Sequence, residues 1–159
     1  GSSGTEVWIY EAPVTSTMQT VTVTISSALA TPARVATFAV CGQHGTTPTE
    51  DTAVRQNGAS ADTSHPTGPV TAAGEGNAAF GIISGTNGVY NTSDGWTSIG
   101  SVTNFHAGYI TGLSSGDTTW TPTTAAGEQT ASALVSITPA AAGASGPPLG
   151  SLGLLGVGR

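Results

Sequence analysis

The sequence predicts an all-β protein, and three observations support this prediction. Residues 19–26 alternate Val21, Val23 and Ile25 with threonine and serine, as in a strand with one buried and one solvated face. Stretches rich in Gly, Pro, Asn and Asp separate the short apolar runs. No segment shows a convincing apolar stripe at the helical period. The pattern therefore predicts antiparallel strands at the spacing of a sandwich or barrel.

The first two strands form a predicted hairpin at the start of the chain. Two later strands, 34–42 and 77–84, are apolar on both faces, which predicts central positions covered by a facing sheet and by a loop or a neighbouring chain. The long stretch 43–69 is expected to be a functional or interfacial loop. In chain order, the expected strands are residues 6–12, 19–26, 34–42, 77–84, 101–113, 117–122 and 129–138.

The chain of 159 residues suits one domain of ordinary size. Residues 1–139 are expected to form this β-sandwich domain, and residues 140–159 a flexible Gly/Ala/Pro linker with a Leu/Gly-rich arm. The arm has too few apolar residues to span a membrane. Two interpretations remain open, a disordered end and an assembly arm that docks on a neighbouring subunit. The candidate assembly residues are Leu149, Leu152, Leu154, Leu155 and Val157.

The composition excludes some partners. Only 8% of the residues are charged, the chain has three arginines and no lysine, and its formal net charge is −6. Nucleic-acid binding requires a basic patch, which this chain cannot build. Attraction to an anionic membrane surface is disfavoured for the same reason. We therefore expect neither a nucleic-acid partner nor a membrane partner.

A search for catalytic or metal-ligating patterns gives no constellation that predicts an enzyme. Cys41 is the single cysteine, and the three histidines show no metal-ligand spacing. The carboxylates of Glu50, Asp51, Asp94 and Asp117 are expected in loops, without the repeated acidic spacing of a calcium loop. No nucleophile elbow is present either. The sequence predicts that the protein is not an enzyme and that no metal or organic cofactor is required.

One aromatic residue is a candidate for ligand contact. Trp96 lies in "NTSDGWTS", a stretch with the composition of a loop. Sugar-binding sandwiches stack sugar rings on exposed aromatic side chains, so Trp96 is a candidate glycan contact if its ring is exposed. The alternative is that Trp96 packs in the core.

Three stretches together resemble the jelly-roll, lectin-like β-sandwich modules of bacteriophage virion proteins and bacterial surface proteins. "EVWIYEAPVTSTMQTVTVTIS" is similar to their hairpin, with Trp8, Tyr10 and Pro13 in place. "VATFAVCGQHGTTPTEDTAV" is similar to a strand followed by a glycine-to-proline loop, although Gln43-His44 stands where those modules often have Asp-Gln. The third stretch is the closing strand, "ASALVSITPAA".

The resemblance implies a jelly-roll-like, antiparallel β-sandwich in a structural protein of a phage-like virion surface. Such a protein would be a capsid decoration or a tail or fibre subunit, with other virion subunits as partners, as a homo-oligomer. The alternative is a carbohydrate-binding adhesion module on a virion or a cell surface, with a glycan partner and a virion, extracellular or cell-surface location. Seven strands are expected in this chain, whereas a jelly roll commonly has eight. Strands from outside this chain are therefore expected to complete the sheets.

Overall fold

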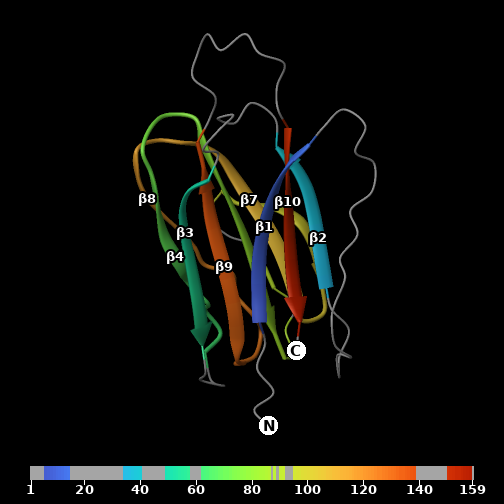
Figure 1. The fold of residues 1–159 in the computed structure, drawn as a ribbon. Helices are drawn as coiled ribbons and strands as arrows, with labels where there is room; N and C mark the ends of the chain where they lie inside the picture. The colour runs from blue at the N-terminus through green and yellow to red at the C-terminus, as the bar shows by residue number, and fades with distance from the viewer. Residues whose placement is uncertain are drawn as a thin grey trace.

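The computed structural model describes residues 6–14, 34–40, 49–57, 62–86, 88, 90–91, 95–138 and 150–158. These residues form strands, turns and irregular connections, with no helix among them (Figure 1). The all-β prediction is therefore confirmed. The strands are β1 (Glu6–Val14), β2 (Arg34–Val40), β3 (Thr49–Asn57), β4 (Thr67–Ala72), β5 (Asn77–Gly85), β6 (Thr97–Val102), β7 (Phe105–Leu113), β8 (Gly116–Trp120), β9 (Thr130–Ile137) and β10 (Gly150–Gly158).

A five-stranded antiparallel sheet has the order β3-β9-β5-β7-β6. Its central strands β9 and β5 are the most completely buried strands of this sheet, and every residue of β9 is buried. Strands covered on both faces have apolar residues at successive positions, which explains the composition of β5 and β9. The predicted central position of residues 77–84 is confirmed, because β5 pairs with both β9 and β7.

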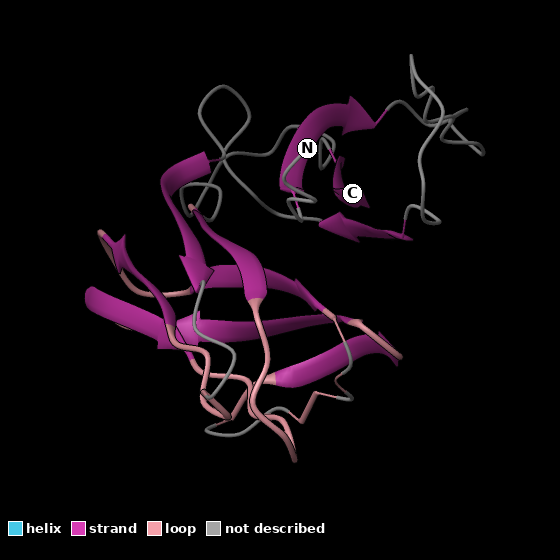
Figure 2. Ribbon diagram, turned by 90° about the horizontal axis from the view of Figure 1, so that it is seen from below, coloured by secondary structure: helices cyan, strands magenta, loops and turns pink. Residues whose placement is uncertain are grey.

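A three-stranded antiparallel sheet has the order β1-β10-β2. It forms a layer of its own beside the five-stranded sheet (Figure 2), and β1 is the strand that lies against β9 and β5. Strand β2 pairs with β10 only, so the predicted central position of residues 34–42 is wrong for the part that the structure describes.

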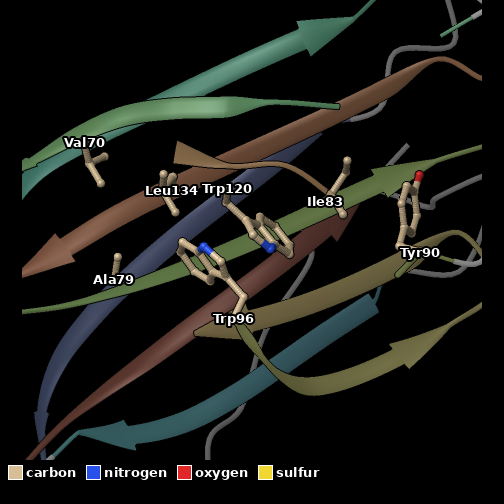
Figure 3. Packing of buried hydrophobic residues seen from close by; sticks show 7 residues of the cluster. All are labelled: Val70, Ala79, Ile83, Tyr90, Trp96, Trp120 and Leu134. Carbon is tan, nitrogen blue, oxygen red and sulfur yellow. The ribbon is translucent and has the colours of Figure 1, made fainter. Parts of the chain in front are cut away.

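A two-stranded ribbon of β4 and β8 packs on the five-stranded sheet, with β4 against β3 and β9. Among the described residues, a large cluster of buried apolar side chains lies under this ribbon (Figure 3). Trp120 of β8 is fully buried there with Val70 of β4, Ile83 of β5 and Leu134 of β9. A second cluster, Phe80, Val135 and Ile137, belongs to the same two central strands β5 and β9. The central strands thus carry buried apolar side chains in two separate clusters.

The structure divides one predicted strand and adds others. Residues 101–113 form the end of β6 and all of β7, joined by a turn at Thr103 and Asn104. Asn104 has a φ of 70°, a left-handed conformation that asparagine tolerates better than most residues. The expected loop 43–69 contains β3 and the start of β4. The predicted strand 19–26 lies outside the described residues.

The C-terminal stretch differs most from its prediction. Residues 150–158 form β10, which pairs along its length with β1 and over residues 151–157 with β2 of the same chain. Leu152, Leu154, Leu155 and Val157 therefore belong to the middle strand of a sheet, whereas a separate arm was expected. Leu149 lies outside the described residues. A boundary at residue 139 does not separate two independent units, because β10 joins the N-terminal strands.

Candidate functional site

The described residues contain no group of three or more histidine, cysteine, aspartate or glutamate side chains that could hold a metal ion. Of the residues considered for chemistry in the sequence, Cys41, His44 and Asp94 lie outside the described ranges. The described histidines, His65 and His106, are both buried. Each of these two histidines lies in its own concentration of buried side chains.

The first concentration, which we name the His65 cluster, consists of His65, Tyr90, Thr124, Glu128 and Thr130, all of them buried. Three connecting segments bring these residues together, and backbone hydrogen bonds join the segments. The His65 N–H donates to the carbonyl of Pro122 at 3.0 Å. The N–H of Asn91, which follows Tyr90, donates to the carbonyl of Thr123 at 2.9 Å. Residues from three loops are thus fixed at one end of the β9 strand.

Hydrogen bonds in this cluster determine which nitrogen of His65 bears the proton. The Thr124 hydroxyl donates to the carbonyl of Ala126 at 2.8 Å, and its oxygen lies 3.0 Å from Nε2 of His65. A hydroxyl has one proton to donate, so Thr124 must accept from the Nε2–H of His65. The opposite nitrogen, Nδ1, then accepts from the Thr130 hydroxyl at 3.4 Å. His65 therefore cannot act as the base that activates Thr124 as a nucleophile.

Glu128 is 2% exposed, and the backbone around it leaves no room for larger residues. Its Oε2 accepts from the N–H of Thr86 at 2.8 Å. A Cβ added at Gly85 would collide with the Tyr90 hydroxyl and the Glu128 carboxylate, and one at Gly88 would collide with Glu128 and Thr124. Glycine at these positions lets the β5 end and the following segment approach the carboxylate closely. The carboxylate is packed against its own chain.

Burial lowers the pKa of the His65 imidazole below its ordinary value, although the nearby Glu128 and Asp62 raise it. Arg55 contributes a smaller decrease in the same pKa. Burial also lowers the pKa of His106. Both imidazoles are therefore neutral at pH 7. The His65 cluster has the residue types of an acid–base site, but its side chains are buried and directed at one another. Their hydrogen bonds and packing hold three loops in place.

The second concentration surrounds His106, which stacks on Trp120 with ring centroids 5.8 Å apart. The two ring nitrogens of His106 and the indole N–H of Trp120 have no hydrogen-bond partner. Unpaired buried polar atoms cost stability. The lowered pKa of His106 has a separate cause, since burial disfavours the charged imidazolium.

Trp96 also packs on Trp120 and is 8% exposed. The two ring centroids are 5.5 Å apart and the planes are tilted by 34°, and Figure 3 shows the two indoles side by side between Ala79 and Ile83. Of the two alternatives for Trp96, packing in the core is the one that the structure shows, because the ring is a member of the core cluster under the ribbon. A glycan contact through this ring would require the core to open.

The carboxylates expected in loops have structural partners instead. Glu50 and Asp51 lie in β3, where Glu50 accepts from the N–H of Ala73 at 3.0 Å and Asp51 from the N–H of Thr71 at 2.8 Å. Asp117 of β8 accepts from the Thr71 hydroxyl at 2.9 Å. These side chains fasten β3 and β8 to the end of β4, so they satisfy backbone and hydroxyl donors of the protein.

Sequence reasoning did not identify the His65 cluster. Its members are distributed between residues 65 and 130 with no local spacing that links them. One signal was available, which is a single glutamate, Glu128, directly before an apolar strand in a chain with few charges. A charged residue at such a position is either exposed or held by specific partners.

The last two properties of the chain are its potential to span a membrane and its similarity to known proteins. The described residues contain no helix long and apolar enough to cross a membrane. No protein-family model matches the chain, and neither the curated proteins nor the solved structures include a significant match to it.

Proposed function

We propose that this chain is a structural subunit of a phage-like virion surface, a capsid decoration or a tail or fibre subunit, that acts by assembling with other subunits. In this proposal its sheets form a jelly-roll-like β-sandwich, and strands from a neighbouring subunit complete these sheets. The resemblance of residues 6 to 140 to virion modules motivates the proposal. The observation that carries it is that both edge strands of the five-stranded sheet expose an apolar side chain.

Both edge strands of that sheet expose an apolar side chain. Val54 of β3 is 79% exposed, and Val102 of β6 is 51% exposed. Among the strands that the structure describes, each of these has one pairing neighbour, β9 or β7. The register places Val54 opposite Ala133 and Val102 opposite Phe105, so each valine lies beside a buried apolar residue. Edges with free backbone groups and exposed valines favour addition of another chain.

The facing sheet is narrower than the sheet that it covers. Three strands lie over five, and contacts between the layers run from β1 to β9 and β5. Among the described strands, β4 packs against the edge strand β3, whereas the three-stranded layer makes no extensive contact with either edge strand, β3 or β6. A subunit that assembles through sheet edges would bury these valines, which supports an assembly function.

The experiment is a measurement of mass in solution over a range of protein concentrations, by light scattering after size-exclusion chromatography. The full chain is expected to form a defined oligomer. Val54→Asp and Val102→Asp are each expected to weaken assembly at least tenfold, because a charge would be buried in the contact. Thr119→Asp is the matched control, since Thr119 is an exposed strand residue of the separate ribbon.

A chain that stays monomeric at all concentrations would contradict the proposal. An adhesion module instead predicts binding to a glycan array by the monomer, with no effect of Val54→Asp on its mass. Binding of this kind without self-assembly would replace the structural function by the adhesion alternative.

A further inference from the structure

The middle strand of the three-stranded sheet is the last strand of the chain. All nine residues of β10 pair with β1, and residues 151–157 also pair with β2. Strands β1 and β2 each have β10 as their pairing neighbour and do not pair with each other. We name the space between β1 and β2 that β10 fills the β10 slot. Without β10, this slot would have an unpaired strand edge on each side.

The pairing of β10 relies strongly on its backbone. Four of its nine residues are glycine, at positions 150, 153, 156 and 158. Gly153 lies in register with Glu11 and Phe38, and Gly156 with Trp8 and Val35. Glycine in a strand offers no side chain to pack and loses much conformational freedom, so each one weakens the strand. Strand addition of this kind gains affinity mainly from main-chain hydrogen bonds.

The connection to β10 is long compared with the strand. Residues 138–149 lie between β9 and β10 and contain no charged residue. Twelve residues can span up to roughly 40 Å, more than the roughly 30 Å length of a nine-residue strand. This reach is enough for residues 150–158 to enter the β10 slot of an adjacent subunit while β9 stays in its own sheet.

We propose that β10 is exchanged between copies of this chain, so that residues 150–158 of one copy fill the β10 slot of the next. The inference rests on the proposed assembly function. Its partner is a second copy of this chain, and its contact is β10 in the β10 slot. An exchanged strand makes the same pairs as an unexchanged one, so exchange costs little and is favoured as subunit concentration rises. Exchange between two copies closes a dimer, and exchange in one direction builds a ring or a filament.

The test uses the register of β1 and β10 in full-length chains with Cys41→Ser. Ile9 and Leu155 are register partners, and paired strand residues have Cα separations within the range of a disulfide. One chain carries Ile9→Cys and a second, differently tagged chain carries Leu155→Cys. The two are unfolded, mixed, refolded and oxidised. Tyr10→Cys with Leu154→Cys provides a second register pair, because adjacent pairs alternate in geometry.

Strand exchange predicts a disulfide-linked heterodimer of the Ile9→Cys and Leu155→Cys chains, at least ten times more abundant than in a matched control. The control mixes Ile9→Cys with Thr119→Cys, whose cysteine is exposed on the separate ribbon. A single chain with both Ile9→Cys and Leu155→Cys shows that the pair can form. If this double variant closes only within one chain, and the mixed chains do not exceed the control, exchange is overturned. Failure of both register pairs to form any disulfide overturns it as well.

The same samples separate this inference from the assembly function. An oligomer by light scattering without a heterodimeric disulfide overturns strand exchange and leaves assembly standing. A heterodimeric disulfide in a sample whose mass does not change with Val54→Asp supports exchange and contradicts assembly through the edges of the five-stranded sheet. A monomer without the heterodimeric disulfide overturns both.

Discussion

Gly81 and Gly100 lie in the same sheet but differ in what surrounds them. A Cβ at Gly81 would meet three carbons of the fully buried Trp120 indole, the farthest at 2.9 Å, whereas a Cβ at Gly100 would meet nothing within 4 Å. Gly81→Ala is expected to destabilise by about 1–3 kcal/mol, because the ring must move in a packed core. Gly100→Ala should be neutral or stabilise by up to about 1 kcal/mol. Urea unfolding measures both, and equal costs would contradict the packing of Trp120 on β5.

The two buried histidines predict a pH dependence of stability. The folded pKa values of His65 and His106 lie below the ordinary value of 6.5, so the unfolded chain binds protons more strongly. The unfolding free energy is therefore unaffected above pH 6.5 and falls as the pH drops below it, until the folded pKa values are reached. Each histidine can contribute up to about 1.4 kcal/mol per pH unit.

Unfolding between pH 7.5 and 5 checks this expectation. His106→Gln should reduce the pH dependence of the unfolding free energy, since a glutamine does not titrate. A stability that is constant from pH 7 to pH 5.5 in the parent chain would show that these imidazoles are not buried as described.

Among the strands, those with a strong apolar pattern could be predicted and the others could not. Residues 77–84 and 129–138 correspond closely to β5 and β9, because strands covered on both faces need apolar residues. Strand β3 was missed because its acidic residues suggest a loop, while in the structure Glu50 and Asp51 accept hydrogen bonds from backbone N–H groups near β4. Strand β10 was missed because glycine is depleted in strands. Its partners are far away in sequence, so no local pattern reveals them.

The candidate site was less predictable than the strands. The polar neighbours of Trp96 in sequence left its exposure open, and packing on Trp120 decides its burial. His65 and Glu128 meet only because β4, β5 and β9 are neighbours in space. Local amino-acid composition predicts neither the burial of Trp96 nor the proximity of His65 and Glu128.

A proline in β10 distinguishes a middle strand from a free tail. In a middle strand, every N–H faces a pairing neighbour, so Leu155→Pro is expected to cost about 1–3 kcal/mol through a lost hydrogen bond and an unpaired acceptor. Thr97→Pro is the matched control, because Thr97 is the exposed first residue of the edge strand β6, where proline is tolerated. Chemical unfolding followed by circular dichroism measures both. An unchanged midpoint for Leu155→Pro would contradict the pairing of β10.

For the molecule as a whole, we predict that folding needs no metal ion. The described carboxylates and histidines have partners within the protein or lie apart from one another, and they form no metal-binding group. The melting temperature should therefore be the same with and without an excess of chelator. A fall of several degrees on chelation, restored by calcium, would revive a calcium site.

The pairing of β1 with β10 also has a consequence for synthesis on the ribosome. More than 130 residues separate the end of β1 from the start of β10. At typical rates of about 5–20 residues per second, β1 emerges and then waits for roughly 7 to 27 s before its partner β10 is translated. During this interval, neighbouring nascent chains on one messenger present the same open strand edges. Slower translation of the codons between β1 and β10 would lengthen that exposure and increase the demand for chaperones.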